Sequence, residues 1–200
     1  MLSRLSPYWL WALLALPAAG MLSPFFSDDP RAMGGVLHGS GEFAARFLII
    51  AMMATPLLML TKGSAFARWL RANRRYFGVA AFGYAALHTL AYVIRAETLE
   101  RVLSQATAVD MLAGWLAFFI FIPLAATSMD AAVRKLGRWW KPLQRWTYAA
   151  AILTLAHWAM LESWGGLAPA LVNFAPLAAL SLYRLWWRSV RVRPAAPAAV

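Results

Sequence analysis

The sequence contains no cysteine, few acidic residues and no long polar stretch. The absence of cysteine excludes disulfide bonds, iron–sulfur clusters and thiolate chemistry. Short connections join the apolar stretches, which excludes a soluble domain of any size. The chain also lacks the glycine-rich motif of dinucleotide-binding domains, so it cannot oxidise NAD(P)H by itself. No internal repeat is obvious.

Apolar residues dominate what is present. They make up 62% of the 200 positions, and the mean hydropathy of +0.58 is far above that of a soluble domain. A bilayer core of ~30 Å is crossed by about 20 apolar residues per helix, and spanning segments must pair their own backbone groups, which favours helices. Six stretches have this length: residues 8–26, 43–61, 76–94, 110–128, 143–161 and 167–187. The sequence therefore predicts an all-α membrane protein, one six-helix bundle over residues 1–200 with a disordered tail at 194–200.

The net charge of +11 is unevenly distributed along the chain. Fifteen of the 19 lysines and arginines lie on one side: before the first stretch, between the second and third, between or bordering the fourth and fifth, or near and after the end of the sixth. Seven of the eight acidic residues lie on the opposite side. Because basic connections stay in the cytoplasm, both termini are expected to be cytoplasmic. Topology accounts for the charge, so we expect membrane lipid, and no nucleic acid, among the partners.

Two histidines, His88 and His157, lie inside apolar stretches. Each follows by 13 positions a residue at the cytoplasmic edge of its stretch, Arg75 or Gln144, which corresponds to a helical rise of ~20 Å. If both stretches run outward, the two imidazoles lie at one depth, toward the outer leaflet. Histidine at membrane depth is rare and usually functional, although a packing hydrogen bond is the alternative. Two facing neutral imidazoles are the ligands that a bis-histidine haem needs.

Other polar residues near the outer end are weaker candidates. A zinc or copper site would need a third or fourth ligand, and no thiol or intramembrane carboxylate is available. His38, just outside the second stretch, is either a solvated loop residue or a contact for a haem propionate or a periplasmic partner. Arg46 is a better propionate partner, or an interfacial arginine that extends to the surface. Gly78, Gly83 and the alanines around them offer small surfaces against which a porphyrin could lie.

Three segments carry a resemblance to a known family. They are LHGSGEFAARFLIIAMMATPL, RRYFGVAAFGYAALHTLAY and RKLGRWWKPLQRWTYAAAILTLAHW. Together, over residues 36–160, they resemble the haem-binding membrane subunit of the periplasmic methionine sulfoxide reductase system (the MsrQ or YedZ family), within the ferric reductase-like transmembrane group. The resemblance implies a multi-pass protein of the bacterial inner membrane that carries haem b and passes electrons from a quinol or flavin to a periplasmic molybdopterin catalytic subunit. It also implies FMN on the cytoplasmic side.

Gln144 departs from that family pattern, in which its position is normally a histidine. Glutamine is a poor iron ligand, and the arginine at the same depth, Arg75, has no lone pair for a metal. We therefore expect about one haem b per chain, held by His88 and His157. Gln144, Arg74 and Arg75 would face a flavin or quinone on the cytoplasmic side.

Two other functions stay open. The chain reads as an electron-transfer subunit rather than a self-sufficient enzyme, and its electrons arrive from a quinol, a bound flavin or a separate reductase. The first alternative is a quinone-linked cytochrome that serves another acceptor, such as ferric iron. The second is a non-redox scaffold or small transporter, although a transporter needs broken helices with polar groups at mid-membrane, and the fourth and sixth stretches have few.

Overall fold

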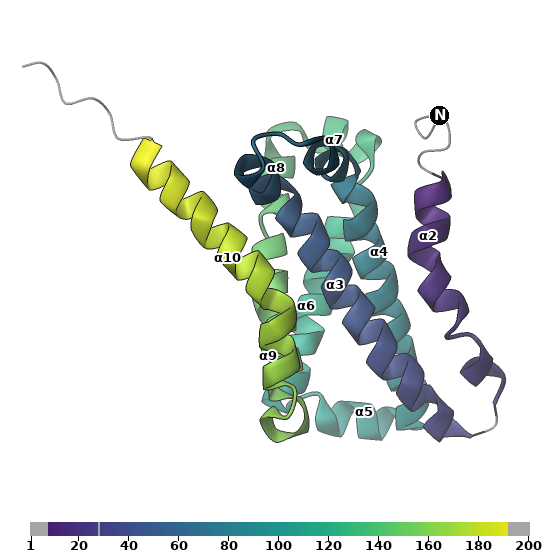
Figure 1. Cartoon of the computed structure of the whole chain (residues 1–200). Coiled ribbons are helices and arrows are strands. Elements are labelled where there is room, and N and C mark those ends of the chain that lie inside the picture. The colour runs from purple at the N-terminus through teal and green to yellow at the C-terminus, as the bar shows by residue number, and fades with distance from the viewer. Residues whose placement is uncertain (1–7, 28, 192–200) are drawn as a thin grey trace, which may run out of the picture.

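The computed structural model describes residues 8–27 and 29–191, and all regular structure within them is helical (Figure 1). The all-α prediction is confirmed, whereas the predicted tail at 194–200 lies outside the described residues. The long helices are α2 (Tyr8–Ala19), α3 (Met33–Leu60), α4 (Ala65–Ala96), α6 (Val109–Ala126), α9 (Thr147–Trp164) and α10 (Leu167–Arg191). The short ones are α5 (Leu99–Gln105), α7 (Asp130–Leu136) and α8 (Trp140–Gln144), with 3-10 turns η1 (Ser23–Phe26), η2 (Pro30–Ala32) and η3 (Gly137–Trp139).

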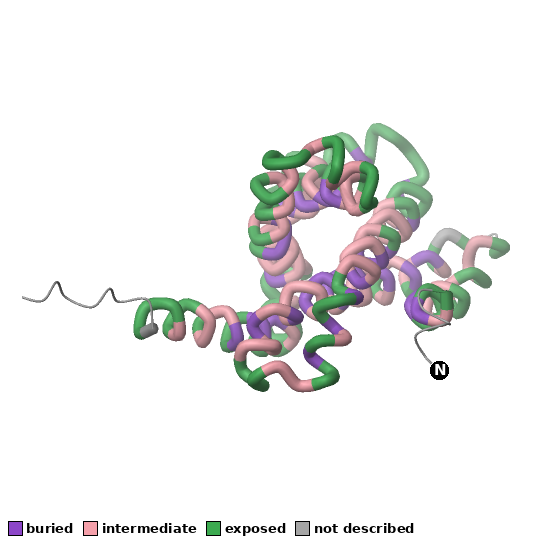
Figure 2. The backbone as a smooth tube through the Cα atoms, turned by 90° about the horizontal axis from the view of Figure 1, so that it is seen from above, coloured by how far each residue is buried: buried purple, intermediate pink, exposed green. Residues whose placement is uncertain are grey.

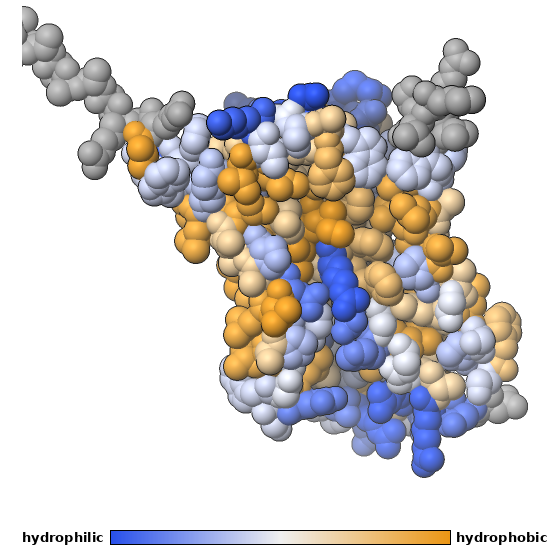
Figure 3. All heavy atoms as spheres, in the orientation of Figure 1, coloured by the Kyte–Doolittle hydropathy of each residue, from blue (hydrophilic) through white to orange (hydrophobic). Residues whose placement is uncertain are grey.

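Four of these helices, α3, α4, α6 and α10, are long and apolar enough to cross a membrane. The helix α2 is apolar but shorter, and polar side chains such as His157 and Glu162 lower the hydropathy of α9. On the face shown in Figure 3, apolar residues gather mainly over the half that carries α7 and α8, hydrophilic residues lie at both ends, and a hydrophilic strip lies between them. The predicted bounds were wrong at one informative place. Because α3 begins at Met33, His38 lies on a helix and not in a loop.

Successive long helices run in opposite directions (Figure 1). The short helices α7 and α8 lie at one end of the bundle, and α5 crosses the other end. The most extensive packing joins α3 to α4 and α6 to α9, and these two pairs surround a common axis (Figure 2). The helix α10 packs on α3 and α9, and its second half leans away from the bundle. The bundle is therefore built from two antiparallel helix pairs.

The turn between α3 and α4 shows how local chemistry sets this pairing. Lys62 and Gly63 have positive φ angles of 49° and 84°, a backbone conformation in which glycine carries no steric penalty. The Ser64 hydroxyl then accepts a hydrogen bond from the backbone N–H of Ala67 at 3.3 Å and begins α4. Such a short connection leaves the two helices as antiparallel neighbours.

The outlying helix α2 is attached to α4 through Tyr84. Its hydroxyl donates to the carbonyl of Leu14 at 2.9 Å and accepts from the N–H of Ala18 at 2.8 Å. These two backbone groups would normally bond to each other within α2. Pro17 lies between them and cannot donate, so the helix is already weakened where the hydroxyl inserts. On its other side the Tyr84 ring packs against Phe47 of α3, with centroids 5.3 Å apart.

Candidate functional site

A cavity of about 340 Å³ lies between α3, α4, α6 and α9, near the end of the bundle that carries α5. Its volume falls within the range of cofactor pockets, roughly 300–1,000 Å³. Most of its lining is apolar, including small residues of α3, α6 and the end of α4. The titratable and hydroxyl groups that border it are His38, Glu42, His88, Thr89, Tyr92, Arg95, Thr154, His157 and Glu162. The cavity is therefore apolar, with a few polar groups that could orient a ligand.

The structure brings His88 of α4 and His157 of α9 together across this cavity. Their ring centroids are 6.1 Å apart and their planes are nearly perpendicular, at 84°. The Nδ1 atom of His88 lies 2.8 Å from the carbonyl oxygen of Leu37, and that of His157 lies 2.7 Å from the carbonyl oxygen of Asp110. A carbonyl can only accept, so each Nδ1 carries the hydrogen and each Nε2 keeps its lone pair. This is the tautomer of a metal-binding histidine.

Each histidine ring also packs against a glycine of the preceding helix. A Cβ atom on Gly41 would lie 2.9 Å from Nδ1 of His88, and one on Gly114 would lie 2.9 Å from Nδ1 of His157. Either contact is closer than van der Waals distance. In both pairs the glycine lies four positions after the carbonyl that binds the ring, on the same helix face. The pairs α3–α4 and α6–α9 thus hold their histidines in the same way, although no repeat is obvious in the sequence.

The separation of the two rings matches what one shared iron requires. An imidazole nitrogen binds a metal at about 2 Å and lies roughly 1 Å from its ring centroid, so rings that share an iron have centroids about 6 Å apart. The observed distance is 6.1 Å. Among the described residues no group of three or more histidine, aspartate or glutamate side chains could hold another metal ion. The donor set fits a bis-histidine haem.

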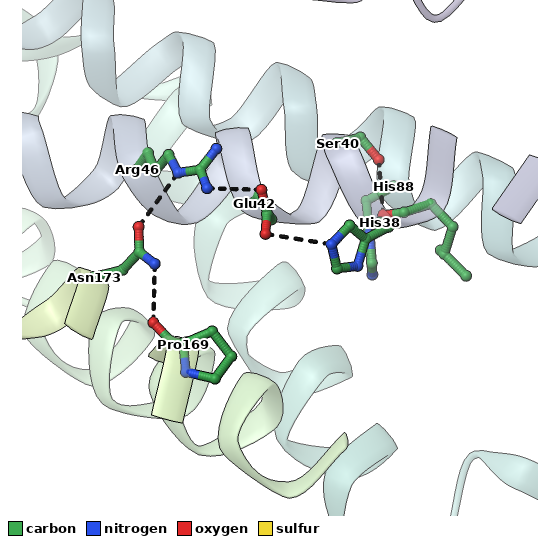
Figure 4. Close-up of polar contacts among 8 residues, drawn as sticks. His38, Ser40, Glu42, Arg46, His88, Pro169 and Asn173 are labelled. Atoms are coloured by element: carbon green, nitrogen blue, oxygen red, sulfur yellow. Dashed lines mark hydrogen bonds and ion pairs between the residues drawn. The ribbon is translucent and has the colours of Figure 1, made fainter. Parts of the chain in front are cut away.

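Arg46, predicted as a propionate partner, does not line the cavity. Its Nη2 lies 2.7 Å from a carboxylate oxygen of Glu42, and its Nε donates to Oδ1 of Asn173 on α10 at 3.3 Å. Figure 4 shows the guanidinium in contact with both Glu42 and Asn173. His38 lies 3.3 Å from the other oxygen of Glu42 and borders the cavity, with a side chain that is 77% exposed. The arginine that does line the cavity is Arg95, which sequence analysis missed.

The small residues that accommodate the site also differ from those predicted. Gly83 borders a second, apolar hollow of about 350 Å³ between α2 and α4, together with Ala80. Of the predicted small residues, Ala85 is the one that lines the histidine cavity. Gly41 and Gly114 were missed because each belongs to the helix before its histidine, more than 40 positions away.

The residues expected at the cytoplasmic level form separate contacts at the other end of the bundle. Gln144 donates from Nε2 to the carbonyl of Leu124 at 3.3 Å and to Oγ1 of Thr127 at 3.2 Å. Arg74 donates to Oγ1 of Thr55 at 3.1 Å.

Arg75 pairs with Asp130 of α7 at 2.5 Å, and its hydrogen bond and charge hold the pKa of that carboxyl below its usual value. Gln144, Arg74 and Arg75 all lie away from the lining of the histidine cavity.

Comparisons with known proteins match this arrangement. The family model described as the ferric reductase like transmembrane component matches residues 40–155, a range that includes His88 and ends just before His157. Three relatives are each described as a protein-methionine-sulfoxide reductase heme-binding subunit MsrQ. The protein of Klebsiella pneumoniae subsp. pneumoniae is 29% identical over 91% of this chain and 96% of its own length. That of Polaromonas naphthalenivorans is 30% identical over 96% and 90%, and that of Azospira oryzae 33% over 92% and 78%.

The chain belongs to the MsrQ family. The ferric reductase like transmembrane component also matches more than half of this chain. Membership, together with the four long apolar helices, makes the chain a multi-pass protein of the bacterial inner membrane. No solved structure matches this MsrQ member.

Proposed function

We propose that the chain is a b-type haem electron-transfer subunit of the bacterial inner membrane. It would pass electrons from a quinol or a flavin to a periplasmic methionine sulfoxide reductase. The relatives are described as heme-binding subunits of a protein-methionine-sulfoxide reductase, which supports the haem and the partner. The observation that carries the proposal is the pair His88 and His157, whose rings lie 6.1 Å apart across a cavity with both Nε2 lone pairs available.

The residues around the cavity have distinct tasks in this proposal. Haem, when bound, supplies one-electron transfer between donor and acceptor. His88 and His157 bind its iron, and the carbonyls of Leu37 and Asp110 fix each ring and raise the basicity of its free nitrogen. Gly41 supplies the space that the His88 ring needs. The apolar lining keeps water from the iron and lowers the local dielectric constant.

The proposed route uses six membrane crossings with both termini in the cytoplasm. The basic connections α3–α4 and α6–α9 lie at the end of the bundle opposite the histidine cavity, and basic connections stay in the cytoplasm. The cavity is then close to the periplasmic face, where the catalytic subunit would receive electrons. A reporter fused after the last residue should show a cytoplasmic C-terminus, and a periplasmic one would contradict this topology.

The expected number of haems per chain depends on the residues at the cytoplasmic end of the bundle. Gln144 and Arg75 offer no imidazole there, so we expect about one haem b per chain. The three residues Gln144, Arg74 and Arg75 remain the candidates for contact with FMN or a quinone head group, since they lie at the cytoplasmic end in this topology.

The test is a reduced-minus-oxidised spectrum of the detergent-purified protein with a haem-to-protein ratio. We expect a low-spin six-coordinate haem b, a ratio near one and a single midpoint potential. The Gln144→His variant should keep that ratio, because Arg75 cannot act as the opposite ligand. A colourless protein would contradict the proposed function, and two haems per chain with distinct midpoints would contradict the assigned ligands.

The description of the family model favours a second candidate, a cytochrome that reduces ferric iron. The two functions differ only in the acceptor. Re-oxidation of the reduced protein by a methionine sulfoxide reductase catalytic subunit, but not by a ferric chelate, supports the first. The reverse result supports the second.

A further inference from the structure

We infer that Arg95 is the cation that binds the propionate carboxylates of the haem, and that Arg46 has a different task. This inference rests on the proposed function, because it assigns a residue to the same cavity. It corrects the sequence-based preference for Arg46.

The position of Arg95 on α4 places it beside the haem ligand. Arg95 follows His88 by seven residues, which is two helical turns and therefore the same helix face. Long side chains on a helix extend back toward its N-terminus, so its guanidinium extends toward the level of His88. Arg95 lines the cavity. Its Nη1 would be 3.8 Å from a Cβ atom on Gly34, so the guanidinium lies near the start of α3, at the outer rim of the cavity.

The charges around the rim leave Arg95 available for a ligand. Glu42 also borders the cavity, but Arg46 at 2.7 Å and His38 at 3.3 Å already accompany its carboxylate. Within residues 8–27 and 29–191, no ion pair involves Arg95 or the remaining carboxylate of the rim, Glu162. A guanidinium binds carboxylates with two parallel hydrogen bonds, and the two propionates of haem are the carboxylates that a haem cavity must accommodate.

Arg46 cannot take this place without losing its own partners. Its guanidinium joins Glu42 on α3 to Asn173 on α10 (Figure 4). Its task is to neutralise the Glu42 carboxylate and to join α3 to α10. Removal of Arg46 should therefore lower the stability of the helix bundle, whether or not the ligand carries free carboxylates, and Glu42→Gln should restore that stability.

The test compares haem with haem dimethyl ester, in which both carboxylates are blocked. Apoprotein of the wild type and of each variant is reconstituted with either compound, and transfer to a haem scavenger gives the rate of loss. Arg95→Leu should speed the loss of haem about tenfold or more, since hydrogen bonds between charged groups are stronger than those between neutral groups. It should leave the loss of the dimethyl ester unchanged. Arg95→Lys should fall between, because lysine keeps the charge but not the paired hydrogen bonds.

The variant Arg46→Leu is the matched control. It should change the loss of haem and of the dimethyl ester equally, and Arg46→Leu/Glu42→Gln should return both toward wild type. Equal acceleration of haem and ester loss by Arg95→Leu would overturn the inference, as would a haem-specific effect of Arg46→Leu alone. Failure of the wild type to form a six-coordinate haem would overturn the proposed function itself.

Discussion

At each end of the bundle, two segments of the chain place one polar residue each at matching positions, but the polar residues at the two ends differ in what they bind. At the end near α5, His88 and His157 face each other across a cavity, and each ring has one nitrogen bound to a carbonyl and one nitrogen free. At the opposite end, Gln144 and Arg75 lie thirteen positions earlier on their segments. There the polar groups donate to protein oxygens: Gln144 to α6, and Arg75 to Asp130.

The histidine end therefore has the features of a ligand site, and the opposite end has those of a structural contact. Polar groups inside a fold are expected to find hydrogen-bond partners, and at the cytoplasmic level the part-buried Gln144 finds them on α6 and at Thr127. At the histidine level each Nδ1 is bound to a carbonyl, and both rings line a cavity whose volume suits a cofactor. Incomplete pairing beside a cavity therefore points to a ligand more strongly than residue type alone.

Of the substitutions that test this difference between the two ends, removal of either histidine should have the largest effect on haem binding. His88→Ala or His157→Ala leaves one imidazole, which cannot hold the iron six-coordinate. We expect the low-spin haem spectrum to disappear in each variant. Gln144→Ala and His38→Ala are the controls and should keep it. Loss of the spectrum in His38→Ala with retention in His157→Ala would show that the ligands are assigned wrongly.

A smaller effect is expected from the glycines behind the rings. Gly41→Ala and Gly114→Ala each place a methyl group 2.9 Å from a histidine nitrogen, so the ring must move from its carbonyl. Loss of such supporting contacts typically lowers metal affinity by 10–100-fold, and we expect about tenfold or more in a haem titration. Gly83→Ala is the matched control, because nothing lies within 4 Å of its added Cβ atom. Equal affinity in all three variants would show that the rings are not held as described.

Sequence alone could predict the helical class and the meeting of His88 and His157, because both depend on periodicity and depth within one chain direction. It could not predict Gly41 and Gly114, since their effect arises only when a neighbouring helix approaches closely. It misjudged Arg46 for a related reason. A basic residue near the outer end has the right charge for a propionate, but Glu42 and Asn173 satisfy it once α3 and α10 pack together.

The bounds of the helices also could not be predicted from the sequence alone. Hydropathy marks the membrane-facing part of a helix, so the second stretch was expected to begin at residue 43. The helix α3 continues beyond that part to Met33, and its polar first turns carry His38 and Glu42 along the rim of the cavity. Polar residues next to an apolar stretch can therefore be helical and belong to the site, which composition does not reveal.

The smallest effect is expected from the pair of Arg75 and Asp130 at the cytoplasmic end. Arg75 lowers the pKa of Asp130, so the pair contributes stability above the usual carboxyl pKa and loses it as the pH falls through the lowered value. The Asp130 side chain is exposed, and exposed ion pairs contribute little. Asp130→Asn should therefore leave the haem ratio and midpoint unchanged, with a barely lower Tm at neutral pH that converges with wild type in acid. A shifted midpoint in Asp130→Asn would show that the two ends are coupled, because the substitution touches no group near the histidines. An unchanged midpoint potential would support the view that the two ends act independently.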